Sequence, residues 1–441
     1  MKMTTLSLIS LGLNDKYYPY GLFCLYEYLV SKTNACITID EFDGAESFAD
    51  SLTGNYKYGE SDYIGFSCYT WNVSEVKLAI THFKKLFPDK KVIIGGPSAY
   101  EFIDNQNVNY ISMGAGEKNL EALISGESSN RVLSYKITPD EKVYPFYNKK
   151  LLEIAKEHQY VPVEMASGCG FQCAYCTQGI EKYKARSLDS IYDELACLKS
   201  NDVSHVNILD TTFNIDKARF ALITEMLRKL EITWHTEIKV DIMDKDCLVL
   251  LNNSTCTSVE IGLQSISVQT NKLINSKFSL DTFKNNLSLV DPNKMNIRVN
   301  TIIGLPGEEF QDWLKTIIFM MENFNGEITS GVLRLYPDAS LYKSKELYGY
   351  EYDSDNEYII TGTNNMSAQE ILLAEVISKI IKHSWNKFSS NKKNSIRDYV
   401  KNSFADSFEQ YLFFILKMLK SNSDLRLGKG IKSFLVSNGV F

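Results

Sequence analysis

The chain has 441 residues, of which 44% are hydrophobic and 23% charged, and its formal net charge is −7. This length predicts about two or three domains, each with enough apolar material for its own core. The acidic balance and the lack of a dense Lys/Arg stripe argue against a nucleic-acid partner, and the basic pair Lys392 and Lys393 is predicted to lie in a solvated turn. No run of about 18 apolar residues is present to span a bilayer, and residues 1–15 lack the features of a secretion signal, so we expect a cytoplasmic protein without a membrane contact.

The first 125 or so residues alternate between strand-like and helix-like patterns. The predicted strands cover residues 6–13, 37–40, 63–67, 92–94 and 110–113, and the predicted helices include 19–29 and 76–87. This alternation is typical of a Rossmann-like, doubly wound parallel α/β sheet with crossover helices. Loops that follow parallel strands meet at one edge of such a sheet, and ligands usually bind there.

A second alternation of strands and helices begins after the polar, weakly patterned residues 126–160. Its predicted strands cover residues 162–167, 205–210, 232–238, 258–263, 296–303 and 331–335, with helices such as 189–198 and 310–324 between them. Six βα units predict an open, partial (β/α)6 barrel, because eight units close a barrel of this kind.

From about residue 341 the strand pattern stops and helical patterns take over, which predicts a mostly helical region. One is expected over 367–385, where Ser367 and Glu370 have the capping-box spacing, and another over 408–419. The sequence therefore predicts a Rossmann-like domain at 1–130, a linker at 131–160, a barrel at 161–340 and a helical region at 341–441 that closes the open side of the barrel.

A group of three cysteines follows the first predicted barrel strand. Residues 167–179 read SGCGFQCAYCTQG, so Cys169, Cys173 and Cys176 have the spacing Cys-x3-Cys-x2-Cys. Three thiolates hold three irons of a four-iron cluster and leave the fourth iron open, which is typical of a reactive site. A structural zinc site would need a fourth Cys or His nearby, and the next 20 residues contain neither; Cys197 falls within a predicted helix.

The motif, with Tyr175 between its last two cysteines, resembles the radical S-adenosylmethionine (SAM) superfamily over roughly residues 160–340. The resemblance implies that SAM binds the open iron through its amino and carboxylate groups, and that a reduced cluster cleaves SAM to a 5′-deoxyadenosyl radical. It also implies a set of SAM-binding positions near the strand ends: Tyr175, Glu237, Glu260, Gln264, Asn300 and Gly304, with Asp210 and Arg298 as weaker ones. Carboxylates suit the ribose diol because each accepts two hydrogen bonds, although a salt-bridged surface role for Glu237 and Glu260 stays open.

The N-terminal loops at 63–72, 93–99 and 113–117 resemble the cobalamin-binding domain that precedes the barrel in one large radical SAM class. The positions implied for the cofactor are Gly95, Gly96, Gly114, Gly116 and Glu117, since small residues let the backbone approach a bulky flat ligand. Cys68, Tyr69 and Trp71 are implied to line the face below the cobalt, where they would take part in catalysis. Ordinary packing at a domain interface is the alternative for these three residues.

The resemblance implies a cobalamin-dependent radical SAM enzyme with a [4Fe-4S] cluster, SAM and cobalamin as cofactors. We expect it to methylate an unactivated carbon of a natural product or peptide, that is, a small-molecule or peptide substrate, and to receive electrons from a donor such as flavodoxin or ferredoxin.

Three alternatives stay open at this point. The first is a radical enzyme without methyl transfer, such as an epimerase, a cyclase or a ring-rearranging enzyme, in which Cys68, Cys247 or Cys256 returns a hydrogen atom. The second is a methylthiotransferase with a further cluster on Cys24, Cys36 and Cys68, although Cys24 is predicted in mid-helix, as a buried thiol. The third is a non-catalytic iron-sulfur or corrinoid carrier.

Overall fold

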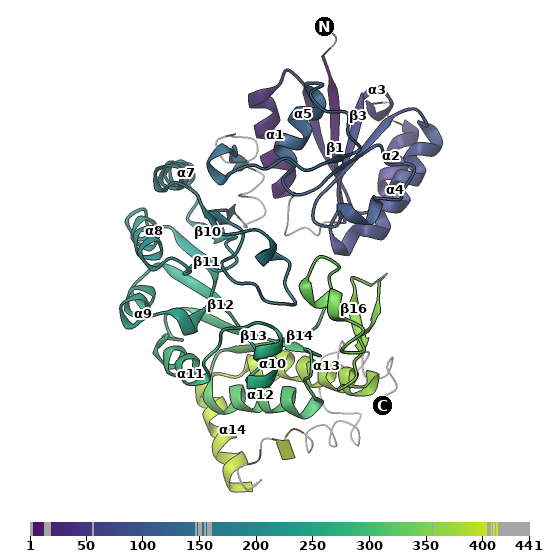
Figure 1. The fold of residues 1–441 in the computed structure, drawn as a ribbon. Helices are drawn as coiled ribbons and strands as arrows, with labels where there is room; N and C mark the ends of the chain where they lie inside the picture. Colours follow the sequence, from purple (N-terminus) through teal and green to yellow (C-terminus); the bar gives the residue numbers. More distant parts are fainter. Residues whose placement is uncertain are drawn as a thin grey trace. The chain divides into compact units, whose positions relative to one another are not determined.

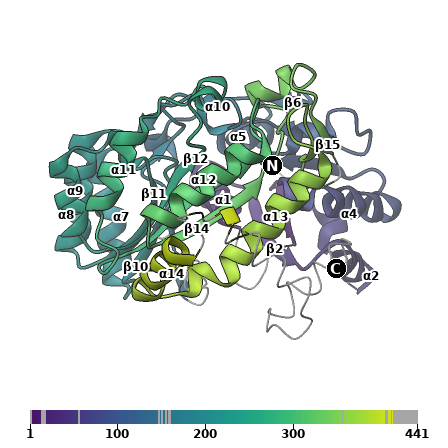
Figure 2. The same ribbon diagram turned by 90° about the horizontal axis from the view of Figure 1, so that it is seen from below.

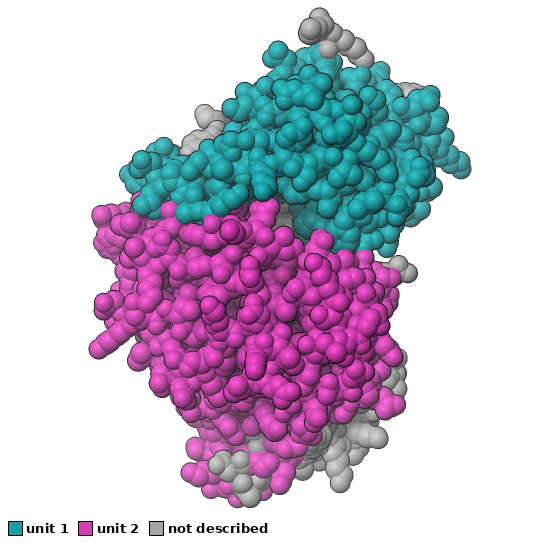
Figure 3. Space-filling view, in the orientation of Figure 1, with its two compact units in different colours: residues 1–166, 184–207 teal, residues 167–183, 208–441 magenta. Residues whose placement is uncertain are grey.

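A computed structural model describes residues 3–12, 19–54, 57–145, 161–354 and 356–403, with isolated positions at 148, 152–153, 156, 407, 409–410 and 412. The chain divides into two compact units, residues 1–166 with 184–207 (unit 1) and residues 167–183 with 208–441 (unit 2) (Figure 3). The predicted helix at 408–419 lies almost wholly outside the described residues. No helix within the described ranges is long and apolar enough to cross a membrane.

Unit 1 contains a parallel sheet of six strands in the order β2-β1-β3-β4-β5-β6. The strands are β1 (Thr5–Leu11), β2 (Cys36–Phe42), β3 (Tyr63–Ser67), β4 (Lys91–Gly95), β5 (Tyr110–Ser112) and β6 (Val132–Leu133). All but the first residue of β1 are buried, as expected for a central strand of a parallel sheet with both faces covered.

Helices cover both faces of this sheet (Figure 1). On one face α1 (Tyr20–Lys32) and α5 (Gly116–Ile124) pack against Leu6 and Leu8. On the other face α2 (Ala45–Gly54), α3 (Lys57–Glu60) and α4 (Val73–Leu86) pack against Ile9 and Leu11. The predicted doubly wound fold is confirmed. The strand order reverses between β1 and β3, and the carboxyl ends of these two strands are the usual ligand-binding position of such a sheet.

Three elements of unit 1 were not predicted from the sequence. Helix α3 is only four residues long, and α2 has a mostly polar sequence from which Ala45, Phe48 and Leu52 pack into the core. Strand β6 lies in the segment predicted as a linker, where it adds a sixth strand beside β5. Two residues are too short to give an alternating pattern, so tertiary pairing alone defines this strand.

The second sheet has the order β14-β13-β12-β11-β10-β7. Its strands are β7 (Pro162–Val163), β10 (His205–Ile208), β11 (Thr233–Ile238), β12 (Cys256–Gln264), β13 (Asn296–Ile303) and β14 (Glu327–Val332). Strands β11 to β14 pair in parallel, each with the next along the chain. Six successive strands confirm the predicted partial barrel. The start of the strand predicted at 331–335 is wrong by about four residues, because Glu327 already pairs with Arg298; residues 333–335 bond to residues 358–360 beyond the end of β14.

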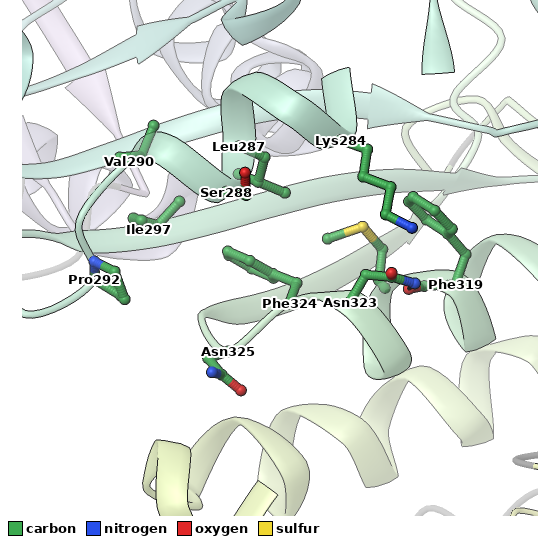
Figure 4. Close-up of a pocket in the computed structure, with 11 residues that line it drawn as sticks. Lys284, Leu287, Ser288, Val290, Pro292, Ile297, Phe319, Asn323, Phe324 and Asn325 are labelled. Atoms are coloured by element: carbon green, nitrogen blue, oxygen red, sulfur yellow. Dashed lines mark hydrogen bonds between the residues drawn. The ribbon is translucent and has the colours of Figure 1, made fainter. Parts of the chain in front are cut away.

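Alternate residues of β11 to β14 face opposite sides of the sheet. In unit 2 the outer layer consists of α8 (Lys217–Lys229), α9 (Lys245–Asn252), α11 (Leu280–Leu289) and α12 (Phe310–Asn323) (Figure 2). Ile297 of β13 faces this layer, where it lines an apolar pocket of about 220 Å³ with Leu287 and Phe324 (Figure 4). Its neighbour Arg298 therefore faces the inner side of the sheet.

The C-terminal segment contains a hairpin as well as helices. Strands β15 (Glu351–Asp353) and β16 (Ile359–Gly362) pair antiparallel, so the expectation that strands stop at about residue 341 is wrong. Helix α13 (Ala368–His383) has the predicted capping box, with Ser367 and Glu370 bonded reciprocally. It lies along β14, where Ser378 Oγ donates to the carbonyl of Ser330.

The basic pair Lys392 and Lys393 lies in α14 (Ser390–Ser403), so the prediction of a solvated turn is wrong. Lys393 is buried, and its ammonium group donates to the carbonyls of Asn325 and Gly326 at 2.6 and 2.8 Å. Burial lowers its pKa to about 8. The aliphatic stem of a lysine packs well in a core when carbonyl groups bind its head, and sequence alone does not reveal such partners.

Arg186 and Glu194 form a completely buried ion pair in unit 1. The Arg186 guanidinium also bonds to Ser190 and stacks on Tyr144 at 3.5 Å from the ring centroid. We expect Arg186→Met to lower the free energy of unfolding by about 3–5 kcal/mol, because it leaves a buried carboxylate without its cation. Denaturant unfolding checks this value. The double variant Arg186→Met/Glu194→Leu is the control and is expected to recover much of the loss; equal losses in both would contradict the ion-pair explanation.

Candidate functional site

The three motif cysteines lie on one loop between β8 (Ala166–Ser167) and β9 (Lys184–Ala185). Backbone N–H groups point at two of the sulfurs: Phe171 N lies 3.5 Å from Cys169 Sγ, and Gln178 N lies 3.4 Å from Cys176 Sγ. Such bonds stabilise thiolates and tune an iron-sulfur cluster. No three Cys, His, Asp or Glu side chains within the described ranges converge on one ion, and a four-iron cluster does not need this, since each thiolate binds a separate iron.

Backbone hydrogen bonds to two other segments, and a close contact within the loop, hold the cysteine loop. Ala174 N donates to the carbonyl of Ile274 at 2.9 Å, and the carbonyl of Ala174 accepts from Leu341 N at 2.8 Å. Gly168 has a φ of +71°, and a Cβ there would lie 2.5 Å from the carbonyl oxygen of Lys182, so only glycine fits. The loop is therefore held in shape before any metal binds.

The loop after β10 lies against the cysteine loop. Thr211 Oγ1 donates to the carbonyl of Gly168 at 3.2 Å, and Thr212 Oγ1 lies 4.0 Å from Cys169 Sγ. The buried carboxylate of Asp210 belongs to the same loop. Asp210 therefore belongs to a loop that contacts the cysteine loop, and its weakly indicated role in SAM binding stays a prediction.

Four charged residues form a row across the inner side of the barrel sheet. Strand pairing aligns Glu237 with Glu260, Glu260 with Arg298, and Arg298 with Glu327. Arg298 Nη1 donates to Glu260 Oε1 at 2.6 Å, and its Nε donates to Glu327 Oε2 at 3.1 Å. The Arg298 guanidinium therefore forms ion pairs with two of the three carboxylates of the row, Glu260 and Glu327.

Glu237 is the carboxylate of this row without a cation. Its side chain makes no hydrogen bond or ion pair with the part of the chain that the structure describes, whereas Glu260 also accepts from Asn300 Nδ2 at 3.0 Å. The Glu237 side chain stays open to solvent, yet desolvation by the surrounding protein and the nearby charge of Glu260 raise its pKa to about 7. A carboxylate of this kind is suited to accept hydrogen bonds from a ligand.

The remaining sequence-predicted SAM positions lie on the same strands or next to them. Thr329 donates to Asn300, and Tyr175 bonds to Gln264 and Cys173. Gln264 ends β12 with a φ of +64°. Gly304 has a φ of +83°, and its carbonyl accepts from Tyr350 Oη at 3.0 Å, so it belongs to a tight turn under the β15–β16 hairpin.

Sequence reasoning missed two polar groups of unit 2. His235 Nδ1 and Ser258 Oγ lie 2.5 Å apart on neighbouring strands beside the charged row, and burial lowers the pKa of His235. Glu308 is fully buried; it accepts from Ser265 Oγ at 2.6 Å, and burial raises its pKa to about 8. His235 lies two residues before Glu237 on the same strand, so the sequence could have indicated that both face the same side of the sheet. The burial of Glu308 could not have been predicted in this way.

In unit 1 the predicted ligand edge presents an aromatic pair directly after β3. The rings of Tyr69 and Trp71 are stacked, with centroids 4.4 Å apart and planes 11° from parallel. Trp71 is 53% exposed, whereas desolvation by burial raises the pKa of Tyr69. Trp71 therefore offers a flat, supported ring face at the point where the strand order reverses.

The other predicted positions of unit 1 differ in their exposure. Cys68 is completely buried in the core, and burial raises its pKa to about 12, so its thiol does not face a ligand. Gly96 has a φ of +96°, and a Cβ there would meet the carbonyl oxygen of Cys68 at 2.4 Å. Gly95 ends β4, Gly114 faces open space, and Gly116 with the buried Glu117 begins α5.

The structure separates the cysteines of the alternative second cluster. Cys36 is the first residue of β2, whereas Cys68 follows the last residue of β3, so they lie at opposite edges of a parallel sheet. Cys24 is buried in mid-helix in α1, on the face of the sheet opposite the core that contains Cys68. The three thiols do not converge on a common site.

Residues 163–320 match the radical SAM superfamily. This part of the chain is a radical SAM domain, as the cysteine motif and the partial barrel indicate. Taken together with the sheet that precedes it, the chain has the fold of cobalamin-dependent radical SAM enzymes. It resembles OxsB, a cobalamin-dependent SAM radical enzyme solved with aqua-cobalamin and SAM, over 99% of this chain and 76% of that one, with a TM-score of 0.66 at 14% identity.

A second solved relative by fold is the radical SAM methyltransferase TsrM of Kitasatospora setae, with cobalamin and a [4Fe-4S] cluster bound. It covers 78% of this chain and 76% of its own, with a TM-score of 0.63 at 17% identity. Between them the OxsB and TsrM structures hold the three cofactors that the sequence predicts for this chain.

Sequence relatives include the ribosomal protein uS12 methylthiotransferase RimO of Clostridium kluyveri, 29% identical over 185 residues, which are 37% of this chain and 40% of that protein. The anaerobic magnesium-protoporphyrin IX monomethyl ester cyclase of Rubrivivax gelatinosus is 25% identical over 180 residues, 39% of this chain and 32% of that protein. The chain thus matches about two fifths or less of the length of these curated relatives.

Proposed function

We propose that this protein is a cobalamin-dependent radical SAM enzyme that methylates an unactivated carbon of a small molecule or peptide. The observation that carries the proposal is that two features occur in one chain. The first is the Cys-x3-Cys-x2-Cys loop of a radical SAM domain, and the second is an exposed aromatic ring face where the strand order of a doubly wound sheet reverses. The fold of OxsB, shared over nearly the whole chain, supports combining the two.

The thiolates of Cys169, Cys173 and Cys176 would hold the cluster. The donor set fits, because the loop offers three thiols and two backbone N–H groups aimed at sulfur, and it is held in shape by the contact at Gly168. When bound, the cluster supplies the electron that cleaves SAM, and methylcobalamin supplies the methyl group. That electron would come from a donor such as flavodoxin or ferredoxin.

The charged row would bind the nucleoside of SAM. Glu237 is free to accept from the ribose hydroxyls, whereas Glu260 is already bonded to Arg298 and Asn300. We therefore assign Glu237 the direct contact, and we assign Arg298 the role of orienting Glu260 beside it. Tyr175, Gln264 and Gly304 would bound the same site through the contacts described above.

Cobalamin would lie at the carboxyl edge of the unit 1 sheet. Trp71, backed by Tyr69, would lie flat against the corrin, and Gly96 and Gly114 would leave room for it. The loop ends at Gly95, Gly116 and Glu117 would border the site. We leave Cys68 out of this set because it is buried in the core.

The experiment that tests the proposed function is anaerobic reconstitution with iron, sulfide and hydroxocobalamin, followed by reduction in the presence of SAM. Formation of 5′-deoxyadenosine together with bound cobalamin supports the proposal. Formation of 5′-deoxyadenosine without bound cobalamin would favour an epimerase, a cyclase or a ring-rearranging enzyme. A bound cluster without any SAM cleavage would favour a carrier.

Replacing Trp71 tests the cobalamin site. We expect Trp71→Ala to weaken cobalamin binding about tenfold, because the stacking ring is lost, and Trp71→Phe to keep most of the affinity. Equilibrium dialysis with hydroxocobalamin measures this. Tyr135→Ala removes another exposed aromatic side chain of unit 1 and is the control. Unchanged binding in Trp71→Ala would place cobalamin elsewhere.

A methylthiotransferase is the second candidate, because RimO proteins are among the sequence relatives. Its support is limited to the radical SAM domain, since Cys24, Cys36 and Cys68 do not converge. An epimerase-like reaction with a cysteine hydrogen donor has less support still. Cys256 lies at the amino end of β12 and Cys247 lies in the outer helix α9, both buried.

A further inference from the structure

A second pocket lies on the inner side of the barrel sheet, at the end of the charged row. Its volume is about 440 Å³, and its lining residues come from β13, β14, the end of α13 and the 3-10 turn η8 (Trp385–Lys387). They are Arg298, Glu327, Thr329, Lys382, His383, Asn386 and Lys387. Three permanent cations thus face one carboxylate, in a chain whose net charge is −7.

The cations of the pocket differ in how they are held. Arg298 is fixed from two sides by Glu260 and Glu327, and its Nη2 group makes no hydrogen bond among the described residues. About 40% of its side chain stays exposed, so the guanidinium keeps donors for a further acceptor. Lys382 and Lys387 form no ion pair with any residue that the structure describes.

The turn that carries Lys387 is locked to β14. Asn386 Oδ1 accepts from Ile328 N at 3.0 Å, and its Nδ2 donates to the carbonyl of Ile328 at 2.7 Å. This amide therefore pairs with the backbone of β14 much as another strand would. The position of the adjacent Lys387 relative to Arg298 is thereby set by the fold.

The dipole of α13 does not account for this set of cations. Lys382 and His383 oppose the negative end of that helix, as basic residues in a last turn commonly do. Lys387, however, lies beyond the helix, and Arg298 comes from β13, about 85 residues away in the sequence. Elements distant in sequence bring their cations to one concave site, where a guanidinium and two ammonium groups together suit a carboxylate or a phosphate.

We propose that this pocket binds an oxyanion of the substrate, a carboxylate or a phosphate group. The inference rests on the proposed function and extends it by naming the substrate class. Arg298 lies on the strand next to Glu260 of the charged row, and neighbouring strands are about 5 Å apart. A substrate whose anionic end is bound here would therefore extend toward the nucleoside of SAM. The cation–anion contact would orient the substrate before any chemistry.

The test is binding of inorganic phosphate and of succinate to the full chain with its cluster reconstituted, in chloride buffer, by isothermal titration calorimetry. We expect saturable binding that weakens with added salt. The double variant Lys382→Gln/Lys387→Gln is expected to bind about tenfold more weakly, because two cations are lost. Lys379→Gln is the matched control: it lies on the same helix, pairs with Glu375 and does not line the pocket.

Binding of either ion that weakens in the double variant supports the proposal, and the more tightly bound ion indicates whether the substrate carries a phosphate or a carboxylate. Absence of saturable binding to the wild type, or equal affinity in the double variant, would overturn it. SAM cleavage is measured separately on the wild-type protein. If the wild type binds the oxyanion but forms no 5′-deoxyadenosine, the proposed function is refuted. If it forms 5′-deoxyadenosine but does not bind the oxyanion, this inference alone is refuted.

Discussion

Replacing Cys173 by alanine is expected to abolish reductive SAM cleavage and the broad visible absorbance of the reconstituted cluster. Cys173 is the middle cysteine of the motif, and the two thiolates that remain would not hold a four-iron cluster with one open iron. The measurements are iron content, absorbance and 5′-deoxyadenosine, all made anaerobically. Cys36→Ala, an exposed cysteine in unit 1, is expected to behave like the wild type.

Circular dichroism and denaturant unfolding of both cysteine variants separate loss of the cluster from loss of the fold. The loop is anchored by backbone bonds at Ala174 and Cys169, so we expect Cys173→Ala to fold normally. A Cys173→Ala protein that keeps its cluster and forms 5′-deoxyadenosine at the wild-type rate would refute the assignment of the motif.

The second large effect is expected at Glu237. We predict that Glu237→Gln weakens SAM binding about ten- to hundredfold, because a hydrogen bond to a charged acceptor is lost. The pKa of Glu237 is raised to about 7, so its carboxylate is fully charged only above that pH. SAM affinity of the wild type should therefore fall as the pH decreases from about 8 to about 6, and this dependence should be absent in Glu237→Gln.

Equilibrium dialysis with SAM across this pH range tests the Glu237 prediction. Glu225→Gln, on the outer helix α8, is the control and should keep both the affinity and the pH dependence of the wild type. If Glu237→Gln binds SAM as tightly as the wild type at pH 8, the carboxylate that contacts the ribose is another one, and Glu260 is the next residue to test.

The sequence by itself determined the class of domain and the order of its elements. The cysteine spacing and the alternation of apolar strands with amphipathic helices are local, so residues such as Cys169 or the strand Asn296–Ile303 were predictable from their neighbours alone. The capping box at Ser367 and Glu370 was predictable for the same reason, since its partners lie three residues apart.

Tertiary structure alone decided which of these residues are free to act. The sequence ranked Glu237 and Glu260 equally, yet of these two carboxylates only Glu260 is bonded to Arg298, which lies on the next strand. Cys68 lies in the core. Lys393 is buried, and its ammonium group donates hydrogen bonds to carbonyl groups about 70 residues earlier in the sequence. Burial and pairing depend on contacts between segments that are distant in the sequence, and a local sequence pattern does not indicate which segments these are. The pocket at Arg298 and Lys387, for example, forms only where β13, β14 and the end of α13 come together.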